Sequence, residues 1–166
     1  MPSLVGSEMC IRDRFGGASV RNADGVRNLR KIIDDEQNLF IIVSAMGKTT
    51  NALEKVFEGL QKGDKQLCME HVAALRDYHA GIIDDLWHGH KQLERVDALF
   101  DELERVASET VYKPSDAELW YDTIVAFGEL VSTLVLVSGL TVLLYLGLLH
   151  VVRRYIRLSL IHISEP

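Results

Sequence analysis

The sequence predicts an α/β protein with a parallel sheet, and three observations lead to that class. The run Leu39–Val43 is short, apolar and rich in β-branched residues, as in a buried strand. Helical periodicity stands on both sides of this run. Two glycine-bearing turns, Phe15–Val20 and Val43–Asn51, each precede a helical pattern. Strands that alternate with helices are typical of a parallel sheet.

The helices on either side of this strand have clear ends in the sequence. Asn22 is placed to cap a helix that runs to about Asp35. A second helix begins near Thr50 and ends at Gly63. Each has one apolar face, formed in the first helix by Val26, Leu29 and Ile33, and in the second by Leu53, Val56, Phe57 and Leu60.

Two longer helices follow and predict an antiparallel helical hairpin over about 64–112, with His88-Gly89-His90 as its turn. Their apolar positions are Leu67, Val72, Leu75, Ile82 and Leu86 in the first helix, and Leu93, Val96, Leu99, Phe100, Leu103 and Val106 in the second. The hairpin therefore interrupts the alternation of strands and helices.

The rest of the chain predicts one more helix and one more strand. Ser115 and Glu118 have the spacing of a capping box, which opens a helix through roughly Val137. The apolar run Val142–Leu149 predicts a strand, and Val151–Arg157 a connecting segment. The first strand of the sheet is expected directly before Phe15, where the composition is poor for a strand.

Composition bounds the class of protein. The chain has 166 residues, 48% of them hydrophobic, which suffices for one domain with a real core. Its net charge of −6 argues against nucleic acid as a partner. Two cysteines do not make a disulfide framework, and the first residues lack the pattern of a signal peptide, so we expect a cytoplasmic protein.

Both ends of the chain look foreign to the sequence between them. Met1–Arg14 and Ser159–Pro166 do not fit the periodicity beside them, and both look like translated sequencing adapter. We therefore expect non-native tails at 1–14 and 159–166, and a biological segment over 15–158.

The two glycine-bearing turns are suited to holding phosphate groups. Glycine lets the backbone approach an anion, and the N–H groups at the start of a helix point toward it. The sequence Gly47-Lys48-Thr49 suggests a P-loop, but that motif needs a glycine five residues earlier, where Ile42 stands. We therefore reject the P-loop and keep two separate phosphate-facing turns.

Three motifs in this order resemble the aspartate kinases of the amino-acid kinase family: FGGAS at 15–19, SAMGKTTN at 44–51 and GELVST at 128–133. The resemblance covers most of the chain. It implies the parallel-sheet core of the amino-acid kinase fold, N-terminal part only, with the helical hairpin inserted. The implied reaction transfers the ATP γ-phosphoryl group to the β-carboxylate of L-aspartate, the first step toward lysine, threonine and methionine.

The resemblance also implies roles for individual residues. Nucleotide phosphates with Mg²⁺ belong at Gly16, Gly17 and Ser19, and aspartate belongs at Ser44, Ala45, Thr50 and Glu129. The family has a catalytic lysine just before Phe-Gly-Gly, and here that position is Arg14, so no catalytic residue is assigned. Family members are homo-oligomeric. The implied protein is a truncated, inactive kinase that binds ATP and L-aspartate, but neither nucleic acid nor membrane.

Three other interpretations stay open. The first is a non-catalytic fragment that binds small molecules. The second is a membrane-anchored helical protein that uses Leu130–Val152, a segment apolar enough for a span and different from the family after Ser138. A metal site is the least favoured, because no structural zinc spacing is found among Cys68, His71, His79, His88 and His90.

Overall fold

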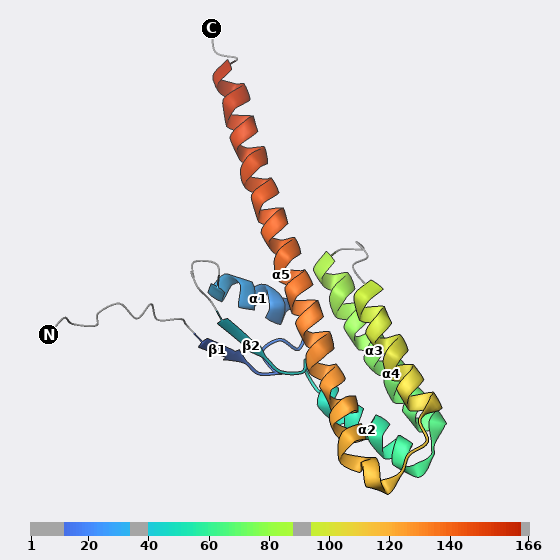
Figure 1. The fold of residues 1–166 in the computed structure, drawn as a ribbon. Helices are drawn as coiled ribbons and strands as arrows, with labels where there is room; N and C mark the ends of the chain where they lie inside the picture. The colour runs from blue at the N-terminus through green and yellow to red at the C-terminus, as the bar shows by residue number, and fades with distance from the viewer. Residues whose placement is uncertain (1–11, 34–39, 88–93, 164–166) are drawn as a thin grey trace, which may run out of the picture.

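The computed structural model describes residues 12–33, 40–87 and 94–163, and this part of the chain is mainly helical (Figure 1). Its elements, in order, are β1 Arg12–Phe15, α1 Ala23–Ile33, β2 Phe40–Val43, α2 Thr49–Lys62, α3 Lys65–Trp87, α4 Glu94–Glu109, the 3-10 turn η1 Pro114–Asp116, and α5 Ala117–Ile163.

The predicted fold class is wrong. Within the described residues the only sheet is formed by β1 and β2, which pair in parallel from Arg12 opposite Phe40 to Phe15 opposite Val43. The other apolar segments form helices that pack on one another, so there is no parallel-sheet α/β core in this part of the chain. Among the described elements, strands alternate with helices only from β1 to α2, and every later element is helical.

The second predicted strand is also wrong. Helix α5 continues without interruption through Val142–Leu149 and through Val151–Arg157. Leucine dominates this run, and leucine is among the strongest helix formers. No proline interrupts the helix after residue 117, and Gly139, which lies between the expected helix and the expected strand, is inside it. The expected helix end near Val137 was therefore too early.

Several helix ends agree with the sequence. The side chain of Asn22 accepts a hydrogen bond of 3.0 Å from the Gly25 amide, which confirms the cap of α1. Gly63 has φ 68° at the end of α2, as a left-handed C-cap requires. The start of α5 differs from the prediction, because Pro114 begins a 3-10 turn there and the Ser115 hydroxyl donates to Asp116.

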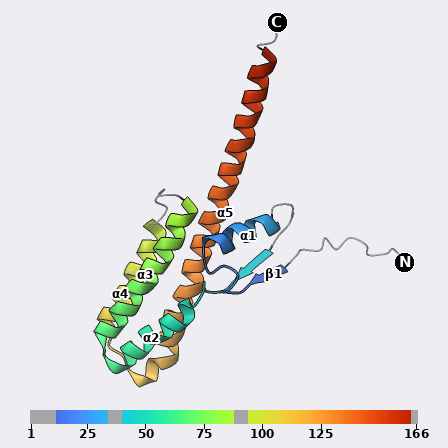
Figure 2. The ribbon, with the colours of Figure 1, turned by 180° about the vertical axis from the view of Figure 1, so that it is seen from behind.

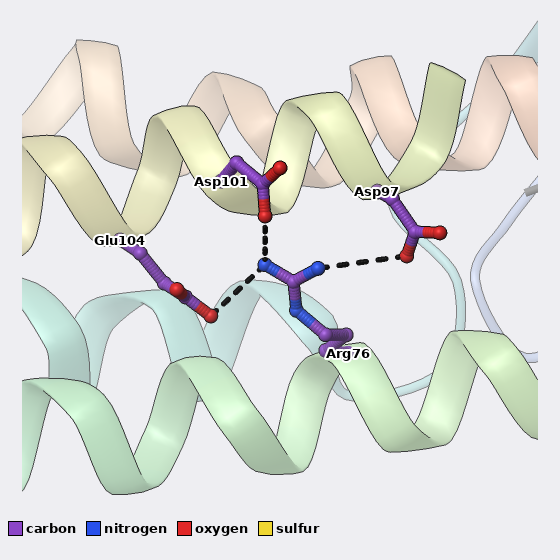
Figure 3. Close-up of polar contacts among 4 residues, drawn as sticks. All are labelled: Arg76, Asp97, Asp101 and Glu104. Atoms are coloured by element: carbon purple, nitrogen blue, oxygen red, sulfur yellow. Dashed lines mark hydrogen bonds and ion pairs between the residues drawn. The ribbon is translucent and has the colours of Figure 1, made fainter. Parts of the chain in front are cut away.

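Helices α3 and α4 lie side by side, as the predicted hairpin requires, while its expected turn at 88–90 lies outside the described residues. One arginine of α3 joins them (Figure 3). The Arg76 guanidinium pairs with three carboxylates of α4, at 2.7 Å from Asp101, 2.9 Å from Glu104 and 3.5 Å from Asp97. It also lies over the Phe100 ring, 5.5 Å from the ring centre.

Helix α5 is the central element of the molecule. The unit β1–α1–β2 lies on one side of it and the α3–α4 hairpin on the other, and its C-terminal half extends beyond both, as both views show (Figures 1 and 2). Its buried residues join a core shared with α1 to α4. On α5 these residues are Ile124, Phe127, Val131, Val135 and Leu136.

One helix in the described residues is long and apolar enough to cross a membrane by length and composition. This stretch, Pro114–Thr141, has 28 residues, a mean hydropathy of 1.9, and 44% of its most apolar window buried in the protein. Val131, Val135 and Leu136 face the core, whereas Leu130 and Val137 are exposed, so one side of this part of α5 packs inside the protein.

Candidate functional site

The two glycine-bearing loops lie against each other. They follow β1 and β2, and the carboxyl ends of neighbouring parallel strands lie at the same edge of a sheet. The Gly47 amide donates a 2.9 Å hydrogen bond to the Gly17 carbonyl. A Cβ at Gly17 would stand 2.4 Å from the Ala45 carbonyl oxygen, so only glycine allows this approach.

The second loop turns sharply into α2. Gly47 has φ 57°, a left-handed conformation that glycine adopts without strain. Two residues later, the Thr49 side chain donates a 2.7 Å hydrogen bond to the Met46 carbonyl and closes the turn. No side chain caps the start of α2, and its first turn has no acidic residue. The positive end of this helix therefore has no carboxylate of its own beside Thr50.

Helix α5 forms the third side of the site. Its Ser132 hydroxyl is buried and donates a 2.8 Å hydrogen bond to the Ser44 carbonyl. One turn earlier, a Cβ at Gly128 would stand 2.8 Å from the Ala45 Cβ. In the sequence, Glu129 lies between Gly128 and Ser132. It is exposed, and its carboxylate forms no ion pair with the residues that the structure describes. The three sequence motifs therefore meet in space.

The predicted site residues fall into two groups. Gly17, Ser44 and Ala45 are in direct contact with the other motifs, whereas Gly16 and Ser19 lie on the exposed side of the first loop. Within that loop the Ser19 amide donates to the Gly16 carbonyl at 2.9 Å. The remaining residues are Thr50, half-buried in the first turn of α2, Glu129 on α5, and Arg14, which pairs with Ile42 in the sheet.

Two residues beside the site were missed by the site prediction. Tyr78 and His79 of α3 contact the loops from the side of the helical hairpin. His79 is fully buried, with Nδ1 2.8 Å from the Leu75 carbonyl and Nε2 3.5 Å from the Thr49 hydroxyl oxygen. Because a carbonyl only accepts, Nδ1 carries the proton and Nε2 is free to accept. The sequence did indicate that His79 is buried, because this histidine continues the spacing of the apolar residues on its helix, which are Val72, Leu75, Ile82 and Leu86.

The candidate metal site is not assembled from the residues that the structure describes. Within the described ranges, no group of three or more histidine, cysteine and acidic side chains is arranged to hold a metal ion. His88 and His90 lie outside those ranges. Cys68 is buried, and its thiol donates to the Val56 carbonyl at 3.3 Å. Burial raises the pKa of this thiol, which disfavours the thiolate that a metal would need.

The burial of His79 predicts a pH dependence of stability. Burial lowers the pKa of His79 in the folded protein, while the hydrogen bond to Leu75 opposes that shift only in part. Below about pH 6.5, His79 therefore binds a proton in the unfolded chain but not in the folded protein. The free energy of unfolding is therefore highest above this pH and falls as the pH drops below it. We expect the melting temperature to drop between about pH 7.5 and about pH 5.5, and by less in His79→Gln.

The control for this measurement is His71→Gln, which removes a half-buried histidine of the same helix. It should keep the drop of the parent chain. An equal drop in the His79→Gln variant and the parent would contradict the assignment of the pH dependence to His79.

Two curated aspartokinases are similar to this chain in sequence. No protein-family model matches the chain. Lysine-sensitive aspartokinase 3 of Escherichia coli is 29% identical over 133 residues, which are 80% of this chain and 28% of that protein. An aspartokinase of Chlamydia trachomatis is 33% identical over 98 residues, 54% of this chain and 22% of that protein. The chain thus spans about 28% or less of the length of the curated relatives it matches.

Two solved structures are similar in fold and sequence. One is E. coli aspartokinase III with lysine and aspartate, with a TM-score of 0.66, 27% identity, and coverage of 78% of this chain and 28% of that one. The other is the same enzyme with aspartate and ADP, with a TM-score of 0.67, 27% identity, and coverage of 80% and 29%. The resemblance found in the motifs is confirmed: this chain is an aspartokinase-like sequence, similar to the aspartokinases over about four-fifths of its length.

Proposed function

We propose that this chain carries the N-terminal part of an aspartate kinase site. The reaction is transfer of the ATP γ-phosphoryl group to the β-carboxylate of L-aspartate, the first step toward lysine, threonine and methionine. One observation carries the proposal. Three motifs that are far apart in the sequence meet at the carboxyl ends of two parallel strands, joined by the contacts of Gly17, Ala45 and Ser132.

The first loop is the proposed place of the nucleotide. Gly16, Gly17 and Ser19 would hold the phosphates of ATP, with Mg²⁺ as the partner of the phosphate charge. The exposed side of this loop supports that role, because an ideal Cβ at Gly16 has no atom within 4 Å apart from those of Gly16 and its chain neighbours. The presence of ADP in a solved structure 27% identical to this chain supports it further.

The second loop and α5 are the proposed place of L-aspartate. Ser44, Ala45 and Thr50 would line the substrate, and Glu129 would hold its ammonium group. The charge on Glu129 suits a cation, and its carboxylate forms no ion pair within the described part of the chain. The same solved structure contains aspartate.

We further propose that the chain alone does not turn over. It spans only 28% of the E. coli relative, and arginine stands at the position of the family lysine. The planar guanidinium of Arg14 does not replace a compact ammonium. The kinase-related segment is taken as 15–158, with the hairpin at about 64–112 and non-native tails at 1–14 and 159–166, in a cytoplasmic, homo-oligomeric family without nucleic-acid or membrane partners.

Binding of each ligand tests the two halves of the site separately. Purified chain is titrated with Mg-ADP and with L-aspartate by calorimetry, in the parent and in the matched variants Gly16→Ala and Glu129→Gln. We expect Gly16→Ala to weaken ADP binding about 10-fold and to spare aspartate. Glu129→Gln should weaken aspartate binding about 10-fold and spare ADP, because a hydrogen bond to a charged group is worth about 1.5–3 kcal/mol.

Neither variant should disturb the fold. Gly16 has an open space where the methyl group would stand and no left-handed φ, and Glu129 is exposed. If Gly16→Ala binds ADP like the parent, the first loop is a plain turn. If the parent binds neither ligand, the proposed site does not exist in this chain. Formation of aspartyl phosphate, trapped as the hydroxamate, would show that Arg14 does replace the lysine.

A further inference from the structure

One tyrosine of the helical hairpin contacts both loops of the site. The Tyr78 hydroxyl donates a hydrogen bond of 2.5 Å to the carbonyl of Arg21, which follows the first loop. The same hydroxyl covers Gly47 of the second loop, where a Cβ would stand 2.5 Å from it. Gly47 in turn donates its amide to Gly17. The phenol therefore lies where the two loops meet and bonds to one while covering the other.

The residue after Tyr78 lies beside the second loop at another point. His79 is fully buried, and its Nε2 faces the hydroxyl oxygen of Thr49, which donates to the Met46 carbonyl. Two successive residues of α3 thus lie against the second loop, Tyr78 at Gly47 and His79 at Thr49.

The hairpin that presents these residues is itself fixed. The His79 ring lies 5.6 Å from the Phe100 ring of α4, and the Arg76 guanidinium covers the same phenylalanine while it pairs with three α4 carboxylates (Figure 3). A continuous series of contacts therefore runs from α4 through α3 to the loops. A side cavity of about 200 Å³ beside them is lined by Tyr78 and by Lys48 of the second loop.

We propose that Tyr78 is a positioning residue that sets the spacing of the two loops from the α3–α4 hairpin. Its hydroxyl holds the first loop through Arg21, and its ring closes the space above Gly47, so that the second loop stays in its left-handed turn. The effect on ligands rests on the proposed function, because this spacing decides the room left for nucleotide phosphate. The effect of Tyr78 on the position of the two loops does not depend on a bound ligand.

A double-mutant cycle between Tyr78→Phe and Gly47→Ala tests the contact in the full chain. Gly47→Ala should lower the melting temperature, both because φ is left-handed and because the methyl group meets the Tyr78 hydroxyl. Tyr78→Phe removes that hydroxyl, so it relieves the clash with the methyl group but not the strain of the left-handed φ. The loss caused by Gly47→Ala should therefore be smaller when Tyr78→Phe is also present, by about 2–4 °C. The control is Tyr121→Phe on α5, which removes a hydroxyl bonded to Glu54 at 3.2 Å and should leave the Gly47→Ala loss unchanged.

Hydrogen exchange separates positioning from general destabilisation. In Tyr78→Phe the Gly47 amide, which bonds to Gly17, should exchange about 10-fold faster, while amides in the middle of α4 keep their rates. Additive losses in the cycle together with an unchanged Gly47 rate would overturn the proposal.

Affinity for Mg-ADP tests the functional part. If the parent binds ADP, Tyr78→Phe should weaken binding several-fold, and equal affinity would overturn the role of Tyr78 in nucleotide binding. If the parent binds no ADP while the cycle and the exchange rates behave as expected, the proposed nucleotide site fails and the positioning of the loops by Tyr78 stands.

Discussion

Gly17→Val is expected to separate the two loops and to destabilise the protein by about 3 kcal/mol, the upper range for overpacking. The new Cβ would lie 2.4 Å from the Ala45 carbonyl oxygen and 3.1 Å from that of Gly47. Both are backbone atoms, so neither moves away without breaking the bond from the Gly47 amide to the Gly17 carbonyl. Urea unfolding followed by circular dichroism measures the loss.

The matched control is Gly16→Val, one residue earlier in the same loop. Apart from Gly16 and its chain neighbours, no atom lies within 4 Å of an ideal Cβ at this position, so the free energy of unfolding of this variant should be close to that of the parent. The sequence alone gives both glycines the same role beside phosphate. Equal losses at the two positions would contradict the assignment of Gly17 to the contact between the loops.

Gly128→Val is expected to have the second large effect, a loss of about 2–3 kcal/mol, because it forces α5 away from the second loop. Its Cβ would stand 2.8 Å from the Ala45 Cβ and 3.2 Å from Leu53 Cδ1. The Ala45 Cβ is fixed to the backbone and cannot rotate away. The hydrogen bond from Ser132 to the Ser44 carbonyl, one turn along α5, should break with it.

Gly81→Val is the control for this substitution, since Gly81 is also inside a helix but is exposed with nothing within 4 Å of a Cβ. It should stabilise the protein slightly, by a few tenths of a kcal/mol, because valine is a better helix former than glycine. Thermal unfolding of the two variants measures the difference. A Gly128→Val protein as stable as the Gly81→Val protein would show that α5 does not pack on the loop as described.

Local signals in the sequence predicted the ends of elements well. The Asn22 cap, the Gly63 C-cap and the strand ending at Val43 depend on neighbouring residues only, and all three are present. The helices at 65–87 and 94–109 follow from their apolar spacing. Such features are encoded within a few residues, so sequence analysis finds them.

The errors concern what a segment packs against. A leucine-rich run such as Val142–Leu149 fits a buried strand or a helix equally by hydrophobicity, and no proline follows Gly139 within α5, so the helix continues through the run despite Gly147. Gly139 itself lies in close packing, since a Cβ there would stand 3.2 Å from side-chain methyl groups of Leu86 and Val26. That contact joins residues distant in sequence, so no local pattern reveals it.

The candidate site shows the same division. The motifs pointed to Gly17, Ser44 and Ala45, and these residues do meet the other motifs. Tyr78 carries no motif, and its contacts with Arg21 and Gly47 cross 57 and 31 positions of the chain, respectively. Support of this kind depends on how α3 lies across the loops, which the sequence of α3 does not state.

In the part of the chain that the structure describes, the sheet has two short strands, and this has a consequence for how the protein opens. Strands of four residues with a single neighbour hold few hydrogen bonds, and an isolated pair of strands is marginal in water. Excursions from the native state should therefore begin with β1 and β2, while α2 to α5 stay together as a cooperative unit. The loops beyond the strands are tied to that helical unit through Tyr78, through the Thr49 hydroxyl that donates to the Met46 carbonyl, and through Ser132. The conformation of the two loops can thus persist after β1 and β2 have separated.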